Sequence, residues 1–244
     1  MLDSYNLRAR LFPAILGIAP AIALAAISIS WNQIGLPQVI ATVAVGVLFF
    51  TFSDIARRFG KRTERNFFRE NGGRPFPKVL RHRDDRLDRQ SKARYRAWLA
   101  EKLDEKGPTE DEERDDPMSA DAFYDRCGIW LRERTRDTKR FQVLFEENIT
   151  YGFRRNLYGL KWPVLALNII IVFFCIFMLT KGNDIIGDIV SREKIYAVLT
   201  ISALHALYFI LFVTCKSVTE ASNQYDRQLI LCSETLMDDE KNLS

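Results

Sequence analysis

Three long stretches of this 244-residue chain contain no charged side chain. They run from Leu11 to Ser53, from Trp162 to Thr180 and from Ile195 to Cys215. All 35 basic and 31 acidic residues therefore lie in the rest of the chain. A single soluble core would instead interleave apolar and charged residues at the period of its helices or strands. The pattern excludes a simple soluble enzyme and indicates an integral membrane protein with a charged domain outside the bilayer.

The lengths of the charge-free stretches predict the number of membrane spans. A spanning α-helix needs about 20 apolar residues at a rise of 1.5 Å each. The first stretch is long enough for two such helices, and the sequence Asn-Gln-Ile-Gly-Leu-Pro at 32–37 supplies a turn between them. We therefore expect spans at 11–31, 36–52, 162–180 and 195–215, in two hairpins at 1–56 and 162–215. The expected fold is an all-α membrane protein of four transmembrane helices, with a helical cytoplasmic domain inserted between spans two and three.

Basic residues beside the spans predict their orientation. The turn between the first two spans has no Lys or Arg, whereas the segments before span one, after span two and before span three are rich in them. The segment 181–194, between spans three and four, carries three basic and three acidic residues and favours neither side. We expect both termini and the domain at 57–161 to face the cytoplasm.

The expected cytoplasmic domain at 57–161 is strongly charged and its pattern is helical throughout. It carries 27 basic and 20 acidic residues, and residues 57–96 alone hold 15 basic against 5 acidic ones. Apolar residues at helical spacing predict helices at about 85–106, from Asp116-Pro117 onward, and at about 139–158, with span two continuing to Asn71-Gly72. Gly107-Pro108 is expected to end the helix at 85–106.

The tail at 216–244 also has a helical pattern. Span four is expected to extend into it as one long helix. Four of its residues follow the spacing of a coiled-coil seam, namely Tyr225, Leu229, Cys232 and Leu236. This seam is short, and packing against the chain's own domain and packing between subunits both account for it.

Basic residues of the charged domain form the candidate binding site for a polyanion. They are Arg81, Arg83, Arg86, Arg89, Lys92, Arg94, Arg96, Arg136, Lys139, Arg140, Arg154 and Arg155. Cations mixed with aromatic rings are typical of proteins that bind single-stranded nucleic acid, where the cations contact phosphates and the rings stack on bases. Two other interpretations remain open. The segment directly after span two suits attraction to anionic lipid, and internal ion pairs such as Arg81 to Asp85 would leave a solvated helix face.

Polar side chains inside the expected spans are candidates for a pore. The most polar are Asn168 in span three and Ser202 and His205 in span four. Intramembrane polar groups are functional hypotheses by default, and a symmetric ring of them lines some pores. A hydrogen bond between helices is the alternative, and it is favoured for Asn168. In span one, small residues at four-residue intervals predict close helix contact at Gly17, Ala21 and Ala25.

Signatures of catalysis are lacking in the sequence. It contains no Walker loop, no G-x-S-x-G and no H-E-x-x-H, and it has only two histidines. The four cysteines do not have the spacing of a metal site. Asp84, Asp85 and Asp88 could hold Mg²⁺ in a nuclease, but the surrounding Arg and Lys residues favour internal pairing. We therefore expect no enzyme activity, no cofactor and no bound metal.

Local strings and the four-span layout carry a resemblance to a known family. The strings are TRDTKRF at 135–141 and ENITYGFRRNL at 147–157, together with Gly72-Gly73-Arg74-Pro75 and Arg94-Tyr95. They resemble four-span bacterial membrane effectors that include the channel effector of the Hailong anti-phage system. The resemblance implies a homo-oligomeric ion channel of the bacterial inner membrane whose opening depolarises an infected cell. It also implies that a short single-stranded oligodeoxyadenylate, made by a neighbouring nucleotidyltransferase, holds the channel closed.

Two principal hypotheses follow from the sequence. The first is a ligand-gated channel effector that binds a polyanionic nucleotide or oligonucleotide on its cytoplasmic domain, with four subunits as a natural symmetric arrangement. The alternative is a non-conducting membrane anchor or scaffold that recruits a cytoplasmic partner or nucleic acid. A membrane-tethered nuclease using the acidic cluster is a third hypothesis.

Overall fold

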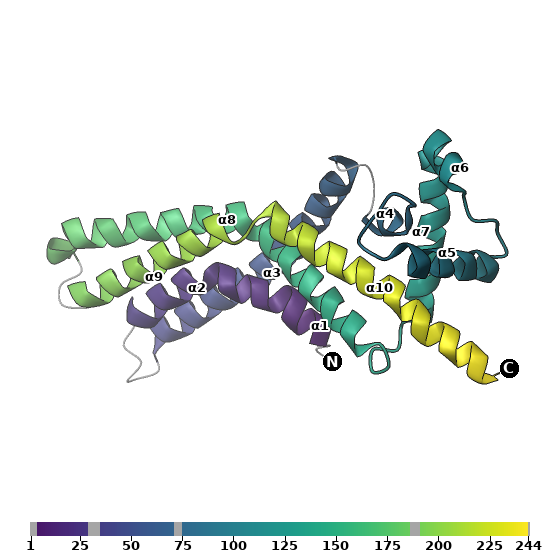
Figure 1. Cartoon of the computed structure of the whole chain (residues 1–244). Coiled ribbons are helices and arrows are strands. Elements are labelled where there is room, and N and C mark those ends of the chain that lie inside the picture. Colours follow the sequence, from purple (N-terminus) through teal and green to yellow (C-terminus); the bar gives the residue numbers. More distant parts are fainter. Residues whose placement is uncertain (1–3, 29–34, 71–74, 186–190, 244) are drawn as a thin grey trace. The chain divides into compact units, whose positions relative to one another are not determined.

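The computed structural model describes residues 4–28, 35–70, 75–185 and 191–243 of the chain. Every regular element among these residues is a helix (Figure 1). The elements are α1 (Ser4–Asn6), η1 (Leu7–Leu11), α2 (Phe12–Ser28), α3 (Leu36–Glu70), α4 (Pro75–Leu80), α5 (Arg89–Leu103), α6 (Glu110–Asp115), α7 (Pro117–Arg134), α8 (Gln142–Ile185), α9 (Arg192–Leu211) and α10 (Cys215–Leu243). The expectation of an all-helical fold is confirmed for the described residues.

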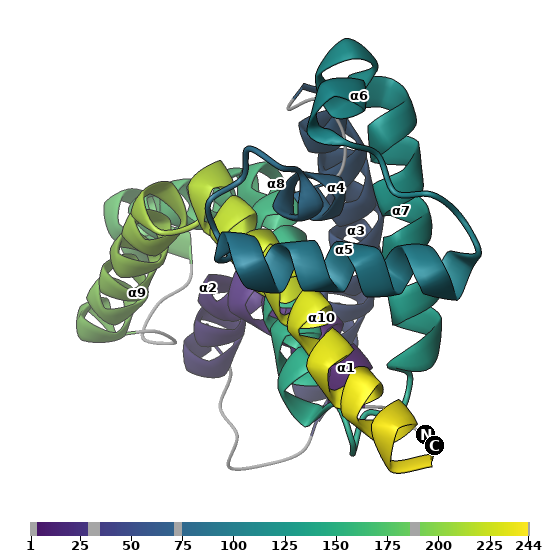
Figure 2. The same ribbon diagram turned by 45° about the vertical axis from the view of Figure 1, so that its right-hand side comes forward.

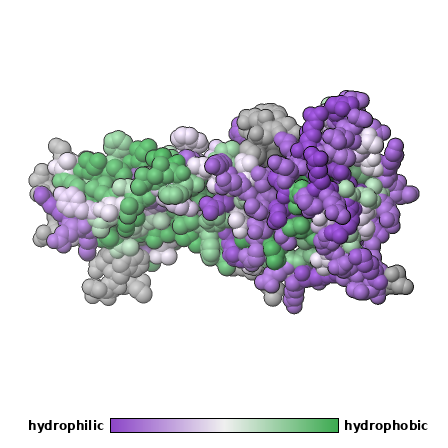
Figure 3. Space-filling model, in the orientation of Figure 1, coloured by the Kyte–Doolittle hydropathy of each residue, from purple (hydrophilic) through white to green (hydrophobic). Residues whose placement is uncertain are grey.

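Four helical segments are long and apolar enough to cross a membrane. They are Ser4–Ile27, Gln38–Arg65, Gln142–Thr180 and Arg192–Leu211, and they overlap the four expected spans. Large apolar side chains remain on their surfaces, since Phe50 of α3 is 73% exposed and Phe173 of α8 is 68% exposed. Figure 3 shows hydrophobic residues gathered over the region of α2, α8 and α9. Apolar surface of this extent is stable only against lipid or other helices, as in a membrane protein.

The chain divides into two compact units. Unit 1 comprises residues 1–64 and 152–218, and unit 2 comprises residues 65–151 and 219–244. The α4 to α7 helices belong wholly to unit 2, whereas α3, α8 and α10 each contribute residues to both units. The membrane-length segments therefore lie mainly in unit 1, and the short charged helices lie in unit 2.

Unit 1 is built from close contacts between its apolar helices. One buried cluster includes Ile18 of α2, Phe52 of α3, Leu160 and Val164 of α8, and Phe209 of α9. Gly17 packs directly on α8, because a Cβ added to it would lie 2.7 Å from Val164 Cγ2. The prediction of close helix contact is thus confirmed at Gly17.

Unit 2 has a separate core formed by α4, α5, α7 and the C-terminal helix α10. Its almost completely buried side chains include Phe76, Leu80, Leu99, Tyr124, Leu131, Leu229 and Ile230. Two residues of the expected seam, Leu229 and Cys232, lie in this core, and Tyr225 and Leu236 pack against it. Figure 2 shows α5 crossing α10, and side chains of the two helices are hydrogen-bonded. The seam therefore packs within its own unit.

The ends of the unit 2 helices follow local capping. Helix α7 begins at Pro117 as expected, and Asp116 accepts a hydrogen bond from the Ser119 backbone N–H at 3.1 Å. The expected bounds 85–106 are wrong for α5 at both ends. It begins at Arg89 because the Asp88 carboxylate accepts from the Ser91 N–H at 2.8 Å, and it ends at Leu103, where Asp104 has a left-handed φ of 51°. The helix therefore stops before Gly107.

Two short helices of unit 2 are absent from the sequence-based expectations. No helix was expected at Pro75–Leu80, where α4 forms and where Phe76, Val79 and Leu80 become buried in the core. Helix α6 begins with a capping box, in which the Thr109 and Glu112 side chains bind each other's backbone N–H groups. The T-x-x-E signal for α6 was present in the sequence.

The expectation that span four and the tail form one helix is wrong. Helix α9 ends at Leu211 and α10 begins at Cys215. The Lys161 ammonium group donates to the carbonyls of Ile210 and Val213, at 3.3 and 2.9 Å, and so satisfies groups left open at the end of α9. Thr214 starts the new helix, because its Oγ1 accepts from the Ser217 N–H at 3.2 Å.

Helices α3 and α8 approach each other closely at Gly60 and Gly159. A Cβ added to Gly159 would lie 2.6 Å from the Gly60 nitrogen, whereas one added to Gly46 of α3 would meet nothing within 4 Å. We expect Gly159→Ala to destabilise the protein by about 1–3 kcal/mol, because backbone must move, and Gly46→Ala to be nearly neutral. Thermal unfolding of the purified full-length protein measures both. Equal melting temperatures for the two variants would contradict the close approach.

Candidate functional site

The basic segment at the start of α5 is organised by a buried lysine. Lys92 is only 1% exposed. Its ammonium group donates to the carbonyls of His82 and Asp84, the former at 3.3 Å, and thereby fixes the loop between α4 and α5. Burial lowers the pKa of Lys92 below its ordinary value. Lys92 therefore has a structural position behind the surface, and the loop that it holds presents the neighbouring arginines.

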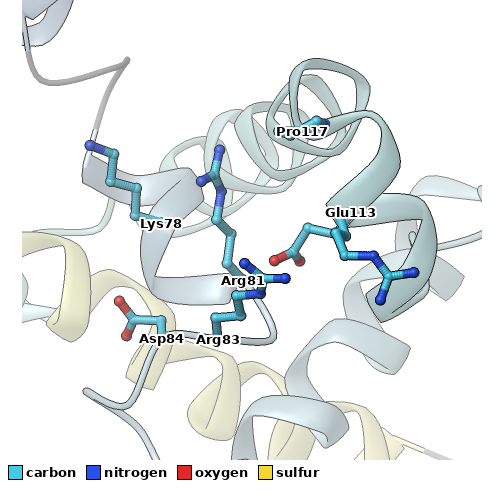
Figure 4. A pocket seen from close by; sticks show the side chains of 7 residues that line it. Lys78, Arg81, Arg83, Asp84, Glu113 and Pro117 are labelled. Carbon is cyan, nitrogen blue, oxygen red and sulfur yellow. The ribbon is translucent and has the colours of Figure 1, made fainter.

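A cavity of about 320 Å³ lies next to this loop in unit 2. Its lining residues are Lys78, Arg81, Arg83, Asp84, Glu113, Arg114 and Pro117. Figure 4 shows Lys78, Arg81, Arg83 and Asp84 along one side of the cavity and Glu113 and Pro117 along the other. The lining of the cavity thus contains four basic and two acidic side chains.

Both carboxylates of the cavity are occupied by donors of the protein. Glu113 is 6% exposed, and it accepts from the His82 backbone N–H at 3.1 and 3.2 Å and from the Tyr124 hydroxyl at 2.9 Å. Burial raises the pKa of Tyr124, so its phenol stays protonated and keeps donating. Asp84 accepts from the Arg86 guanidinium at 2.6 Å. Glu113 therefore joins the loop to α7, and Asp84 is paired with a cation of the same loop.

Five of the twelve basic residues expected to bind a polyanion form ion pairs inside unit 2. The pairs are Arg81–Asp121, Arg86–Asp84, Arg94–Glu234, Arg136–Glu133 and Arg140–Asp239. Arg81 thus pairs with Asp121 of α7, whereas the sequence suggested Asp85. The Arg96 guanidinium instead donates to the Leu80 carbonyl at 3.0 Å. Internal pairing, one of the interpretations left open by the sequence, accounts for these side chains.

The C-terminal helix supplies much of the negative charge in these contacts. Besides its pairs with Arg94 and Arg140, α10 contributes Glu240, which lies 2.9 Å from the Lys102 ammonium group and accepts from the Trp98 indole N–H at 3.1 Å. Glu234 also accepts from the Tyr95 hydroxyl at 2.6 Å. One basic face of α5 is therefore covered by acidic side chains of α10.

The remaining expected ligand residues are divided between the two units. Arg83, Arg89 and Lys139 of unit 2 are exposed and form no ion pair with the residues that the structure describes. Arg154 and Arg155 belong to unit 1, where the Arg155 guanidinium lies 2.8 Å from the Glu64 carboxylate. Arg83 alone of these residues also lines the cavity of unit 2.

The acidic cluster considered for a metal is used locally. Asp84 binds Arg86, and Asp88 caps α5 through Ser91, a hydrogen bond that lowers the pKa of the Asp88 carboxyl. Within the described ranges, no group of three or more His, Cys, Asp or Glu side chains is arranged to hold a metal ion. Asp84 and Asp88 thus have structural partners in the loop before α5.

In unit 1, two prolines of the first apolar helix free backbone carbonyls that other helices then bind. Pro20 has no N–H, so the Leu16 carbonyl four residues earlier lacks its helical donor. The His205 Nε2 atom of α9 lies 2.9 Å from this carbonyl. Since a carbonyl can only accept, His205 donates from Nε2 and leaves Nδ1 as an acceptor. His205 thus supplies the hydrogen bond that Pro20 removes.

The same arrangement occurs about two helical turns earlier, at Pro13. The carbonyl of Ala9 lies four residues before Pro13, and the Asn156 side-chain amide of α8 donates to it at 2.7 Å. Asn156 is completely buried and was not a candidate in the sequence. The sequence does contain a signal for Asn156. A proline inside an apolar helix leaves a carbonyl without its donor, and a polar residue close to another span can supply one.

All three pore candidates take part in contacts within unit 1. The Asn168 amide donates to the Ser202 carbonyl at 3.0 Å and lies 2.9 Å from His205 Nδ1, which accepts from it. Asn168 is 4% exposed and Ser202 is fully buried. The hydrogen bond between helices that was favoured for Asn168 is therefore present, and His205 links α2, α8 and α9.

A double substitution tests whether His205 replaces the donor lost at Pro20. We expect His205→Leu to destabilise the protein by about 1 kcal/mol, the usual size of such contacts between membrane helices. In the Pro20→Ala background the new N–H can bind the Leu16 carbonyl, so the same substitution should cost clearly less. Thermal unfolding of the four proteins gives the coupling, with Pro163→Ala as the control background. Equal losses in the Pro20→Ala and wild-type backgrounds would contradict the assignment.

Comparisons of the chain with protein-family models, with curated proteins and with solved structures found no match.

Proposed function

We propose that this protein is a homo-oligomeric ion channel of the bacterial inner membrane, controlled by an anionic nucleotide or single-stranded oligonucleotide. Unit 2 and both termini lie in the cytoplasm in this proposal, and the ligand binds unit 2. The resemblance to four-span anti-phage effectors favours a role in antiviral defence, with a neighbouring nucleotidyltransferase as the source of the ligand. A tetramer is the natural closed arrangement around a central pore.

The observation that carries the proposal is the joining of two chemically different units by shared helices. Four membrane-length apolar segments lie mainly in unit 1, and the basic cavity lies in unit 2. Helices α3, α8 and α10 contain residues of both units. A ligand that favours one packing of unit 2 therefore acts on helices that also belong to unit 1, which is how a binding energy can shift a membrane equilibrium.

The polar contacts of unit 1 set a condition on channel opening. Asn168 and His205 bind each other and the carbonyls of Ser202 and Leu16. A pore lined by these side chains requires that the contacts break, whereas a pore between copies leaves them intact. We place the resting contacts in the closed state, and ligand exchange on unit 2 changes the balance between the two states.

The hydrogen bonds among the polar side chains of unit 1 favour a second candidate function. Because the Asn168 and His205 side chains are hydrogen-bonded within one protomer, the four helices also suit a non-conducting anchor. Exposed Arg83 and Lys139 would then attract a cytoplasmic partner or nucleic acid to the membrane. This scaffold differs from the channel in one property, which is ion conduction.

Ion flux through liposomes tests the channel directly. We expect purified full-length protein to let ions cross the membrane of liposomes that contain an ion-sensitive dye, so that the dye fluorescence changes. Added nucleotide or oligonucleotide should change the rate of this ion flux severalfold. Protein-free liposomes and liposomes with a heat-unfolded sample are the controls. If correctly inserted protein conducts in no ligand state, the channel is excluded and the scaffold remains.

Fusion reporters test the proposed orientation. Alkaline phosphatase attached to the C-terminus should be inactive and a green fluorescent protein there should fluoresce, because the first needs export and the second folds in the cytoplasm. Phosphatase attached after Thr180, at the end of the third span, should be active. The reverse pattern would show that unit 2 faces the other side of the membrane.

A further inference from the structure

The cavity of unit 2 brings basic side chains from three different segments to one place. Lys78 comes from α4, and Arg81 and Arg83 come from the loop before α5 (Figure 4). Arg114 comes from α6. A solvated charge run on one helix would not produce this convergence. Residues separated by more than 30 positions in sequence meet here because α4 and α6 both pack against α7. Helix α4 does so through the core of unit 2.

The cations of the cavity differ in how firmly they are held. Arg81 is fixed by two parallel hydrogen bonds to Asp121, at 2.9 and 2.5 Å. Arg114 pairs with Asp111 at 2.8 Å and Asp115 at 3.5 Å, and both carboxylates are about three-quarters exposed. Exposed pairs of this kind contribute about 0–1 kcal/mol, so a stronger anion can replace them.

Arg83 is the cation of the cavity with the most freedom to bind a ligand. It is exposed, and it forms no ion pair with the residues described by the structure. Meanwhile the two carboxylates of the wall are turned to His82, Tyr124 and Arg86. An incoming anion therefore meets the unpaired Arg83 guanidinium, next to the Arg81 and Arg114 groups that already have carboxylate partners.

We propose that this cavity binds the phosphate groups of an anionic ligand. Guanidinium groups match phosphate oxygens with paired hydrogen bonds, and Arg83 and Arg114 supply such groups beside the fixed Arg81. The volume of about 320 Å³ is at the lower limit of small-molecule pockets, so it accommodates phosphate groups while the rest of the ligand lies outside. The inference rests on the proposed function and specifies where unit 2 holds its ligand.

The experiment compares two exposed arginines from the same part of the chain. Arg83→Glu places a negative charge at the cavity, whereas Arg89→Glu makes the same change at an exposed arginine that does not line it. The probes are inorganic pyrophosphate, ATP and a short 5′-hydroxyl single-stranded DNA, titrated into the detergent-solubilised full-length protein. We expect Arg83→Glu to weaken binding at least tenfold, Arg83→Lys to retain most of it, and Arg89→Glu to stay within twofold.

The three probes distinguish the sources of the phosphate. Binding of pyrophosphate and ATP identifies terminal phosphates, whereas binding of the DNA alone identifies phosphodiesters, and either result supports the cavity if only Arg83→Glu removes it. Equal losses in Arg83→Glu and Arg89→Glu, or no binding of any probe, would overturn the inference. Ion flux is not needed for this readout. If the protein binds the probes through Arg83 but never conducts ions, the channel is refuted and the binding cavity is supported. If the protein conducts ions under ligand control and Arg83→Glu binds the ligand as well as the wild type, the channel is supported and the cavity is refuted.

Discussion

A carbonyl group inside a membrane has no water to bind when its helical donor is missing, and unit 1 is arranged around this constraint. Pro13 and Pro20 each remove a donor from the first apolar helix, and Asn156 and His205 supply the replacements from α8 and α9. Lys161 does the same for the end of α9. Each of these contacts fixes the position of one helix against another. Apolar packing alone fixes it less well, because apolar side chains contact lipid as favourably as they contact a neighbouring helix.

In unit 2 the main constraint is the mutual repulsion of many basic side chains, which nearby acidic side chains reduce. Acidic side chains of α10 neutralise Arg94, Lys102 and Arg140, and Asp121 neutralises Arg81. Two cations of the strongly basic segment 57–96, Arg81 and Arg94, are therefore neutralised by acids from outside that segment. Arg83, which lines the cavity, remains exposed and has no ion-pair partner among the residues that the structure describes.

The sequence predicts the membrane part of this fold because hydropathy and span length are local properties. Short local patterns in the sequence predict four membrane-length segments, the helix start at Asp116-Pro117 and the close contact at Gly17. The partners of individual polar groups are different, because Arg81 meets Asp121 and Asn156 meets Ala9 only after distant segments pack. The same reason explains why Lys92, a candidate ligand in the sequence, is buried behind the loop that it holds. The break at 212–214 also depends on a distant residue, Lys161.

The position of α10 in unit 2 has a consequence for biosynthesis. Leu229 and Ile230 complete a core whose other residues, such as Phe76 and Leu99, leave the ribosome more than 100 residues earlier. Between them, the chain must deliver the third and fourth apolar segments. Domains generally fold as units during synthesis, so unit 2 stays unfinished, with its apolar face open, until the last residues emerge. The core of unit 2 can therefore be completed only after the third and fourth apolar segments have been made.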